Sequence, residues 1–233
     1  MSLRSLAAYG VHLFTASGIA FGFLALIAVI QGDRLMAFVF LGVALIIDGI
    51  DGPLARAVKV QQQTPQIDGQ SLDYVIDYVT YALIPALMVW QWNLVPDGWG
   101  LTAGIAIAMA SAFTFANVNM KTADGYFLGF PAIWNLVVFY LVILGLGPWV
   151  SFVIIGLCLI LTFIPTAYAH PFRVRQIPFL KIGATLVWII AAGVLVYEVL
   201  MMEQTAADVP IFTGLFTLSS LYFFGISLWR SLN

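Results

Sequence analysis

The chain has 233 residues, of which 62% are hydrophobic and only 9% are charged. A soluble domain carries about 25% charged residues, so this composition predicts an integral membrane protein and excludes an ordinary soluble enzyme. The formal net charge is -2 and no basic stretch is present, which gives no support to nucleic acid as a partner.

Eight apolar segments follow one another along the chain. A membrane-spanning helix needs about 20 apolar residues, and on that length the segments predict eight transmembrane helices in one domain, residues 1–233. Their expected ranges are 8–30, 34–58, 70–94, 98–119, 131–146, 148–169, 181–202 and 210–230. The predicted fold is therefore an all-α bundle of eight transmembrane helices.

The basic residues predict how this bundle is oriented. An even number of spans places both termini on one side of the membrane. Eight of the nine basic residues fall on that side: Arg4, Arg56, Lys59, Lys121, Arg173, Arg175, Lys181 and Arg230. Only Arg34 falls on the other side. Because cytoplasmic loops carry the excess of Lys and Arg, we expect both termini to be cytoplasmic.

Two pairs of acidic residues flank the connection between the second and third predicted helices. Asp48 and Asp51 are three residues apart, and Asp73 and Asp77 are four apart, so each pair shares a helix face. Two antiparallel helices joined at the cytoplasmic side would bring all four carboxylates to one depth. Charged groups inside a membrane mark functional sites, and carboxylate oxygen suits hard divalent cations. With Arg56 available for a phosphate, the set predicts a metal site for phosphoryl chemistry at the cytoplasmic face.

This pattern resembles the signature of the CDP-alcohol phosphotransferase family, D-x2-D-G-x2-A-R-x8-G-x3-D-x3-D. All eight signature residues are present: Asp48, Asp51, Gly52, Ala55, Arg56, Gly69, Asp73 and Asp77. The gap from Arg56 to Gly69 holds twelve residues instead of eight. The longer gap, a Gly49 after the first Asp and eight expected spans are similar to bacterial members that transfer the phosphatidyl group of CDP-diacylglycerol to choline and release CMP.

The resemblance implies roles for the signature residues. Asp48, Asp51 and Asp73 would bind two divalent ions, Mn2+ or Mg2+, and Asp73 and Asp77 would be catalytic. Asp77 would complete the metal site or act as the general base that takes the proton of the alcohol. The residues implied in binding the CDP moiety are Gly52, Ala55, Arg56 and Gly69.

Choline is a quaternary ammonium, which cannot donate hydrogen bonds and which proteins bind with aromatic faces. Aromatic and amide side chains expected on the cytoplasmic side are therefore candidates for choline binding: Tyr74, Tyr81, Tyr126, Trp134, Asn119 and Asn135. The basic residues that could contact lipid phosphate are Lys121, Arg173 and Arg175. The family resemblance also implies a homodimer surrounded by membrane lipid.

Two alternatives remain open on the sequence alone. One keeps the chemistry and changes the acceptor alcohol to serine, inositol phosphate or glycerol 3-phosphate. The other is a cation transporter, because acidic residues in membranes also mark ion paths. Transporters often contain inverted repeats, and no second copy of the acidic pattern is visible in this sequence.

Overall fold

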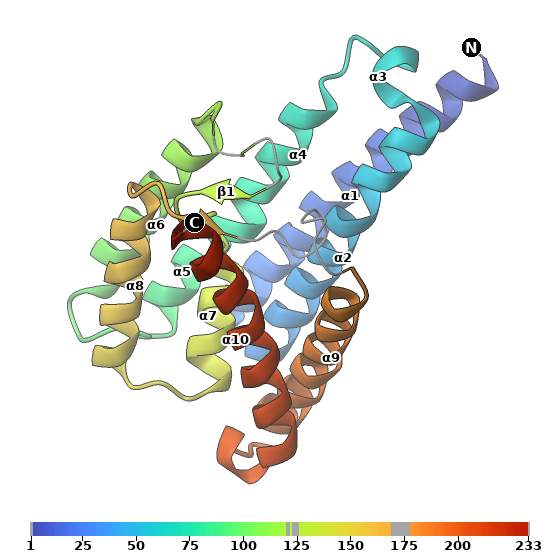
Figure 1. The fold of residues 1–233 in the computed structure, drawn as a ribbon. Helices are drawn as coiled ribbons and strands as arrows, with labels where there is room; N and C mark the ends of the chain where they lie inside the picture. Colours follow the sequence, from blue (N-terminus) through green and yellow to red (C-terminus); the bar gives the residue numbers. More distant parts are fainter. Residues whose placement is uncertain (1, 120–121, 123–125, 169–177, 233) are drawn as a thin grey trace.

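The computed structural model describes residues 2–119, 122, 126–168 and 178–232, and these form a helical bundle (Figure 1). Five of its helical rods are long and apolar enough to cross a membrane. They are α1 (Leu3–Gln31), α2 (Arg34–Val58), the rod of α4 (Gly69–Asp77), η1 (Tyr78–Leu83) and α5 (Ile84–Gln91), the rod of α9 (Pro178–Val196) and η2 (Tyr197–Met201), and α10 (Pro210–Leu232). The helical fold expected from composition is confirmed, and these five rods fit an integral membrane protein.

Three further apolar helices are shorter than a full membrane span: α6 (Gly100–Ala116), α7 (Trp134–Ile143) and α8 (Pro148–Thr162). The small remaining elements are α3 (Val60–Gln63), the 3-10 turn η3 (Ala206–Asp208), and the strands β1 (Phe127–Leu128) and β2 (Ala167–Tyr168). The two strands pair antiparallel and form a two-residue ribbon, which the sequence did not predict. The ends of α1 and α10 that carry the chain termini point toward the same end of the bundle (Figure 1).

The sixth predicted span, 148–169, is too long. Helix α8 ends at Thr162, and the chain continues into β2. Pro165 explains the early end, because a proline disfavours the helical conformation of the residue before it. In the fifth predicted span, 131–146, helix α7 begins only at Trp134, because Ala132 adopts a left-handed backbone with φ of 55°.

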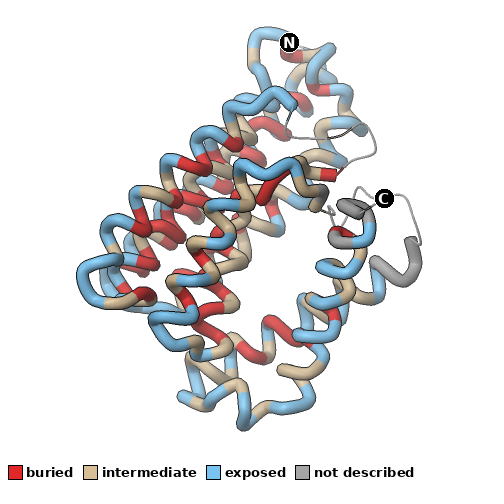
Figure 2. The backbone as a smooth tube through the Cα atoms, turned by 60° about the vertical axis from the view of Figure 1, so that its left-hand side comes forward, coloured by how far each residue is buried: buried red, intermediate tan, exposed pale blue. Residues whose placement is uncertain are grey.

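Helices α1 and α2 pack side by side, and a tight turn joins them (Figure 1). Gly32, at φ of 77°, caps the carboxyl end of α1, and the Asp33 side chain accepts a hydrogen bond from the Met36 amide at the start of α2. Buried residues concentrate on the inner faces of the helices, while the outer faces are exposed (Figure 2). Exposed apolar side chains on those outer faces are what lipid contact requires.

Two glycines let α1 approach the rod that begins with α4. A Cβ on Gly18 would lie 3.1 Å from Ile76 Cγ2, and a Cβ on Gly22 would lie 3.0 Å from Thr80 Cγ2. Small residues four positions apart allow membrane helices to pack closely. The rod itself changes from α-helix to a π-helical turn, η1, directly after Asp77. These features bring α1, α2 and α4 together around the predicted acidic residues.

Candidate metal centre

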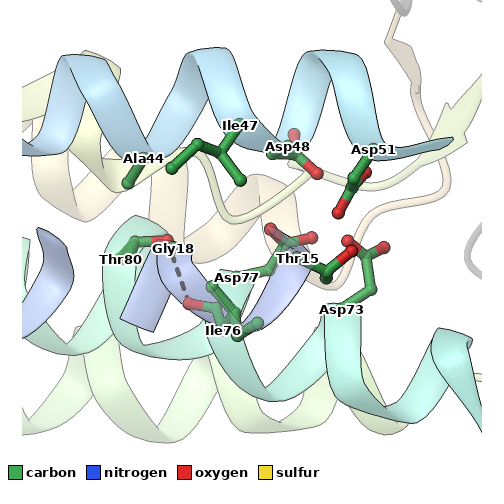
Figure 3. Close-up of a pocket in the computed structure, with 10 residues that line it drawn as sticks. All are labelled: Thr15, Gly18, Ala44, Ile47, Asp48, Asp51, Asp73, Ile76, Asp77 and Thr80. Atoms are coloured by element: carbon green, nitrogen blue, oxygen red, sulfur yellow. Dashed lines mark hydrogen bonds between the residues drawn. The ribbon is translucent and has the colours of Figure 1, made fainter. Parts of the chain in front are cut away.

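A small pocket lies where α1, α2 and the rod of α4 and η1 meet, and all four predicted acidic residues line it (Figure 3). Its lining consists of Thr15, Gly18, Ala44, Ile47, Asp48, Asp51, Asp73, Ile76, Asp77 and Thr80. Its cavity volume of about 10 Å³ is close to the room that one water molecule occupies. The pocket therefore has the size of a site for an ion or a water molecule.

Three of the carboxylates form a tight group. One oxygen from each of Asp48, Asp73 and Asp77 can be chosen so that all three lie within 4.8 Å of one another. Oxygen ligands lie about 2.0 to 2.6 Å from Mg2+ or Ca2+, so two oxygens on one ion are at most about 4 to 5 Å apart. The spacing and the all-oxygen donor set fit a hard divalent cation. This part of the site has the geometry that a metal centre needs.

Asp51 lines the same pocket but lies outside that close group of three. Its side chain is only 6% exposed, and the Thr15 side chain of α1 lies beside its carboxylate (Figure 3). Figure 3 shows Asp51 extending from α2 toward Asp73 on the opposite helix. Asp51 is therefore a neighbour of the close group of three and not a member of it.

Asp48 has a hydroxyl partner of its own. The Tyr81 hydroxyl donates a hydrogen bond to Asp48 Oδ2, with an oxygen–oxygen distance of 2.6 Å. Tyr81 belongs to η1 and is 9% exposed. Both acidic residues of α2 are thus contacted by hydroxyl groups from neighbouring helices, which restricts the orientations their carboxylates can take.

The residues expected to bind CDP divide into two groups. A Cβ on Gly52 would lie 3.3 Å from Arg56 Nη1, so the Arg56 side chain folds back over Gly52, beside the acidic residues. A Cβ on Gly69 would lie 3.3 Å from His12 Cε1, and Ala55 packs against apolar side chains of α1 and α3. Glycine at 52 and 69 therefore leaves room for other groups, whereas Ala55 contributes to helix packing.

Sequence reasoning did not predict the polar contacts of α1 with the connection between α2 and α4. His12 Nε2 lies 3.0 Å from Thr64 Oγ1. Because the Thr64 hydroxyl donates to the Val60 carbonyl, its oxygen accepts the hydrogen bond from His12 Nε2–H. Gln66 donates to the Tyr9 hydroxyl one turn earlier on α1. On α1, Tyr9, His12 and Thr15 follow one another at every third position on one face. This spacing is visible in the sequence.

The aromatic choline candidates differ in accessibility. Tyr126 and Trp134 are 2% and 0% exposed, and the Trp134 ring packs edge-on against Phe130 with centroids 5.0 Å apart. Tyr74 is half-buried and directly follows Asp73. Its hydroxyl accepts a hydrogen bond from Gln70 Nε2 at 2.8 Å. None of the three lines the pocket of Figure 3 as the described residues define it.

The other predicted residues either do not line the pocket or lie outside the residues that the structure describes. Asn135 is buried near the start of α7, and its side chain accepts a hydrogen bond from the Leu136 amide. Asn119 is exposed beyond the end of α6. The residues expected to contact lipid phosphate lie outside the described residues: Lys121, Arg173 and Arg175.

Comparison with known proteins gives a consistent result. The model of the CDP-alcohol phosphatidyltransferase family matches residues 11–164. The phosphatidylcholine synthase of Pseudomonas aeruginosa is 44% identical over 224 residues, which cover 96% of this chain and 92% of the relative. That of Rhizobium meliloti is 41% identical over 181 residues, covering 78% of this chain and 75% of the relative. That of Borreliella burgdorferi is 30% identical over 224 residues, which cover 95% of this chain and 96% of the relative.

Proposed function

The chain belongs to the CDP-alcohol phosphatidyltransferase family, and we propose that it transfers the phosphatidyl group of CDP-diacylglycerol to choline and releases CMP. It is a membrane-embedded phosphatidyltransferase. The choice of reaction rests on the three carboxylates of Asp48, Asp73 and Asp77. One oxygen from each of them lies within 4.8 Å of the other two. The choice of choline rests on relatives named phosphatidylcholine synthase, one of which aligns with 96% of this chain.

The acidic residues would hold divalent cations, either Mn2+ or Mg2+. Asp48, Asp73 and Asp77 are the proposed ligands of one ion, and Asp51 with its neighbour Asp73 would contribute to a second. Bound ions would neutralise negative charge on the pyrophosphate of CDP-diacylglycerol and align it. Carboxylate ligands are the appropriate ones for these hard cations.

The reaction forms one bond and breaks one. The choline oxygen attacks the phosphorus that carries diacylglycerol, and the bond from that phosphorus to the CMP oxygen breaks. Asp77 is the proposed general base, which accepts the choline hydroxyl proton on a carboxylate oxygen. Arg56, folded over Gly52 beside the acidic residues, would bind a phosphate of the nucleotide. Gly52 and Gly69 would leave space for the CDP moiety, with Ala55 supporting the adjoining helix.

For choline itself, Tyr74 is the leading proposal because it is half-buried and follows Asp73 directly. An aromatic ring next to the acidic group would attract the quaternary ammonium by its face. The remaining candidates from the sequence stay as secondary proposals: Tyr126, Trp134, Asn119 and Asn135. For lipid phosphate, the proposed residues are Lys121, Arg173 and Arg175.

We also propose that the five long rods and the shorter helices α6, α7 and α8 all cross the bacterial inner membrane as a single domain. Both termini and the acidic pocket would then lie at the cytoplasmic side. Helix α7 has only 10 residues and would span about 15 Å of a core about 30 Å thick. The preceding segment, 126–133, is buried or half-buried throughout although it is not helical. Such a segment is tolerated at membrane depth when protein surrounds it, so it can complete the crossing. A homodimer is the proposed assembly.

One assay tests the proposed reaction. The purified protein is incubated with CDP-diacylglycerol, Mn2+ and, in turn, choline, serine, glycerol 3-phosphate and inositol phosphate, and CMP release is followed. We expect release with choline. Release with another acceptor and not with choline would replace the proposed substrate.

A matched pair of variants tests the site in the same assay. Asp73→Asn should fold but lose activity, because an amide cannot replace a charged metal ligand. Asp68→Asn is the control, since Asp68 caps α4 by accepting a hydrogen bond from the Gln70 amide, and asparagine caps equally well. Full turnover by Asp73→Asn would contradict the metal assignment.

A further inference from the structure

The π-helical turn η1 places a tyrosine against the acidic group. Asp73, Asp77 and Tyr81 are each four residues apart. A spacing of four residues is slightly longer than one α-helical turn of 3.6 residues. Side chains with this spacing therefore shift gradually around the helix. A π turn is wider and commonly occurs at functional sites. Because η1 begins directly after Asp77, it counteracts this drift and keeps Tyr81 on the side that faces α2.

The contact that results is short and specific. The Tyr81 hydroxyl lies 2.6 Å from Asp48 Oδ2, a length typical of an O–H donor on an ionised carboxylate. The interaction joins residues 33 positions apart in the sequence, on two different helices. It engages one of the two carboxylate oxygens of Asp48, Oδ2.

Tyr81 contacts Asp48 without itself lining the pocket. The side chain is 9% exposed, and it is not among the ten residues that line the cavity. A tyrosine that bound choline with its ring face would need that face to be open to the ligand. The burial and the committed hydroxyl therefore favour an action through Asp48 over a direct contact with substrate.

We propose that Tyr81 is a positioning residue that fixes the orientation of the Asp48 carboxylate for divalent-cation binding. The inference rests on the proposed function, since it takes Asp48 to be a metal ligand. Hydrogen-bond partners of metal ligands restrict ligand rotation, and their loss typically lowers metal affinity or activity by about 10- to 100-fold. The role differs from the choline contact that the sequence had suggested for this residue.

The first test measures Mn2+ binding to the purified full-length protein by electron paramagnetic resonance, without either substrate. Tyr81→Phe removes a single oxygen and keeps the ring, and we expect the Mn2+ affinity to fall about 10- to 100-fold. Tyr78→Phe is the matched control, because its hydroxyl in the same π turn donates to the Ala108 carbonyl at 3.2 Å. That variant should bind Mn2+ as the unmodified protein does.

Two further measurements separate positioning from other roles. In an Asp48→Asn background, Tyr81→Phe should cause no additional loss of Mn2+ affinity, because a residue that acts through Asp48 has nothing left to act on. With saturating Mn2+, Tyr81→Phe should leave the choline KM unchanged. A raised choline KM with unchanged Mn2+ affinity would overturn the proposal and return Tyr81 to the acceptor site.

The outcomes also distinguish this inference from the proposed function. If the unmodified protein does not bind Mn2+, the metal assignment itself fails. If it binds Mn2+ and Tyr81→Phe binds equally well, only the role of Tyr81 is overturned. A fourth measurement keeps both the ring and the hydroxyl in place: 3-fluorotyrosine at position 81 should show a shifted fluorine resonance when Mg2+ is added, and an unchanged resonance would refute the contact.

Discussion

Replacing Gly22 by alanine should disturb the site without removing any functional group. The new Cβ would lie 3.0 Å from Thr80 Cγ2, which is closer than normal van der Waals contact. Thr80 cannot rotate its methyl group away freely, because its hydroxyl donates to the Ile76 carbonyl at 2.9 Å. Helix α1 must therefore move away from the rod of α4 and η1 by a few tenths of an ångström, taking Thr15 and its contact with Asp51 along.

The expected change in the stability of Gly22→Ala follows from two opposing effects. Overpacking costs about 1 to 3 kcal/mol, and alanine in place of glycine in a helix returns about 0.8 to 1.0 kcal/mol. Gly10→Ala, on the same helix, gains the second effect alone, because nothing lies within 4 Å of its new Cβ. Gly22→Ala should therefore be about 1 to 3 kcal/mol less stable than Gly10→Ala, which corresponds to a melting temperature roughly 2 to 12 °C lower.

Activity should follow the same order. A misplacement of about 1 Å can cost about 100-fold in rate, so a shift of a few tenths of an ångström should reduce CMP release about 2- to 10-fold. The assay compares thermal unfolding and CMP release for both variants in the same detergent. Equal stability and equal activity of Gly22→Ala and Gly10→Ala would show that α1 does not need to approach the acidic helices closely.

Two further predictions concern sidedness and the acceptor. A cysteine label at Gln62, in the connection between α2 and α4, should react from the cytoplasm, and one at Asp97, between α5 and α6, from outside. Reaction of both from one face would mean that the number of crossings is wrong. Tyr74→Ala should raise the choline KM and leave the affinity for CDP-diacylglycerol unchanged, whereas Tyr74→Phe keeps the aromatic face and should retain choline binding. An unaltered choline KM in Tyr74→Ala would exclude this ring from the acceptor site.

The helices could be predicted because their signal is long and apolar. The expected range 34–58 coincides with α2, and 210–230 differs from α10 by two residues. Irregular segments gave a weaker signal. The π turn after Asp77 leaves the apolar composition of the third rod unchanged, so no sequence pattern revealed it. Pro165 was visible in the sequence and should have ended the sixth predicted span before 169.

The convergence of the acidic residues could also be predicted, since spacings of three and four place side chains on one helix face. The hydroxyl groups that contact these acidic residues could not be predicted. The contacts of Tyr81 with Asp48 and of Thr15 with Asp51 join different helices, and the helix separation that permits them depends on packing. The glycines at positions 18 and 22 were the available clue, because small residues four apart indicate close packing of membrane helices.

The size of the acidic pocket narrows the choice among the choline candidates. A cavity of about 10 Å³ has room for about one water molecule, so the trimethylammonium group cannot enter it in this conformation. The reacting hydroxyl of choline is only two carbons from the nitrogen, and it must reach the carboxylates. The ammonium must then lie just outside the pocket, close to the acidic residues. Tyr126 and Trp134 are sealed in the core, whereas Tyr74 directly follows Asp73 and is partly open. An aromatic contact for the acceptor is therefore best provided by Tyr74, on the helix that also carries the proposed base.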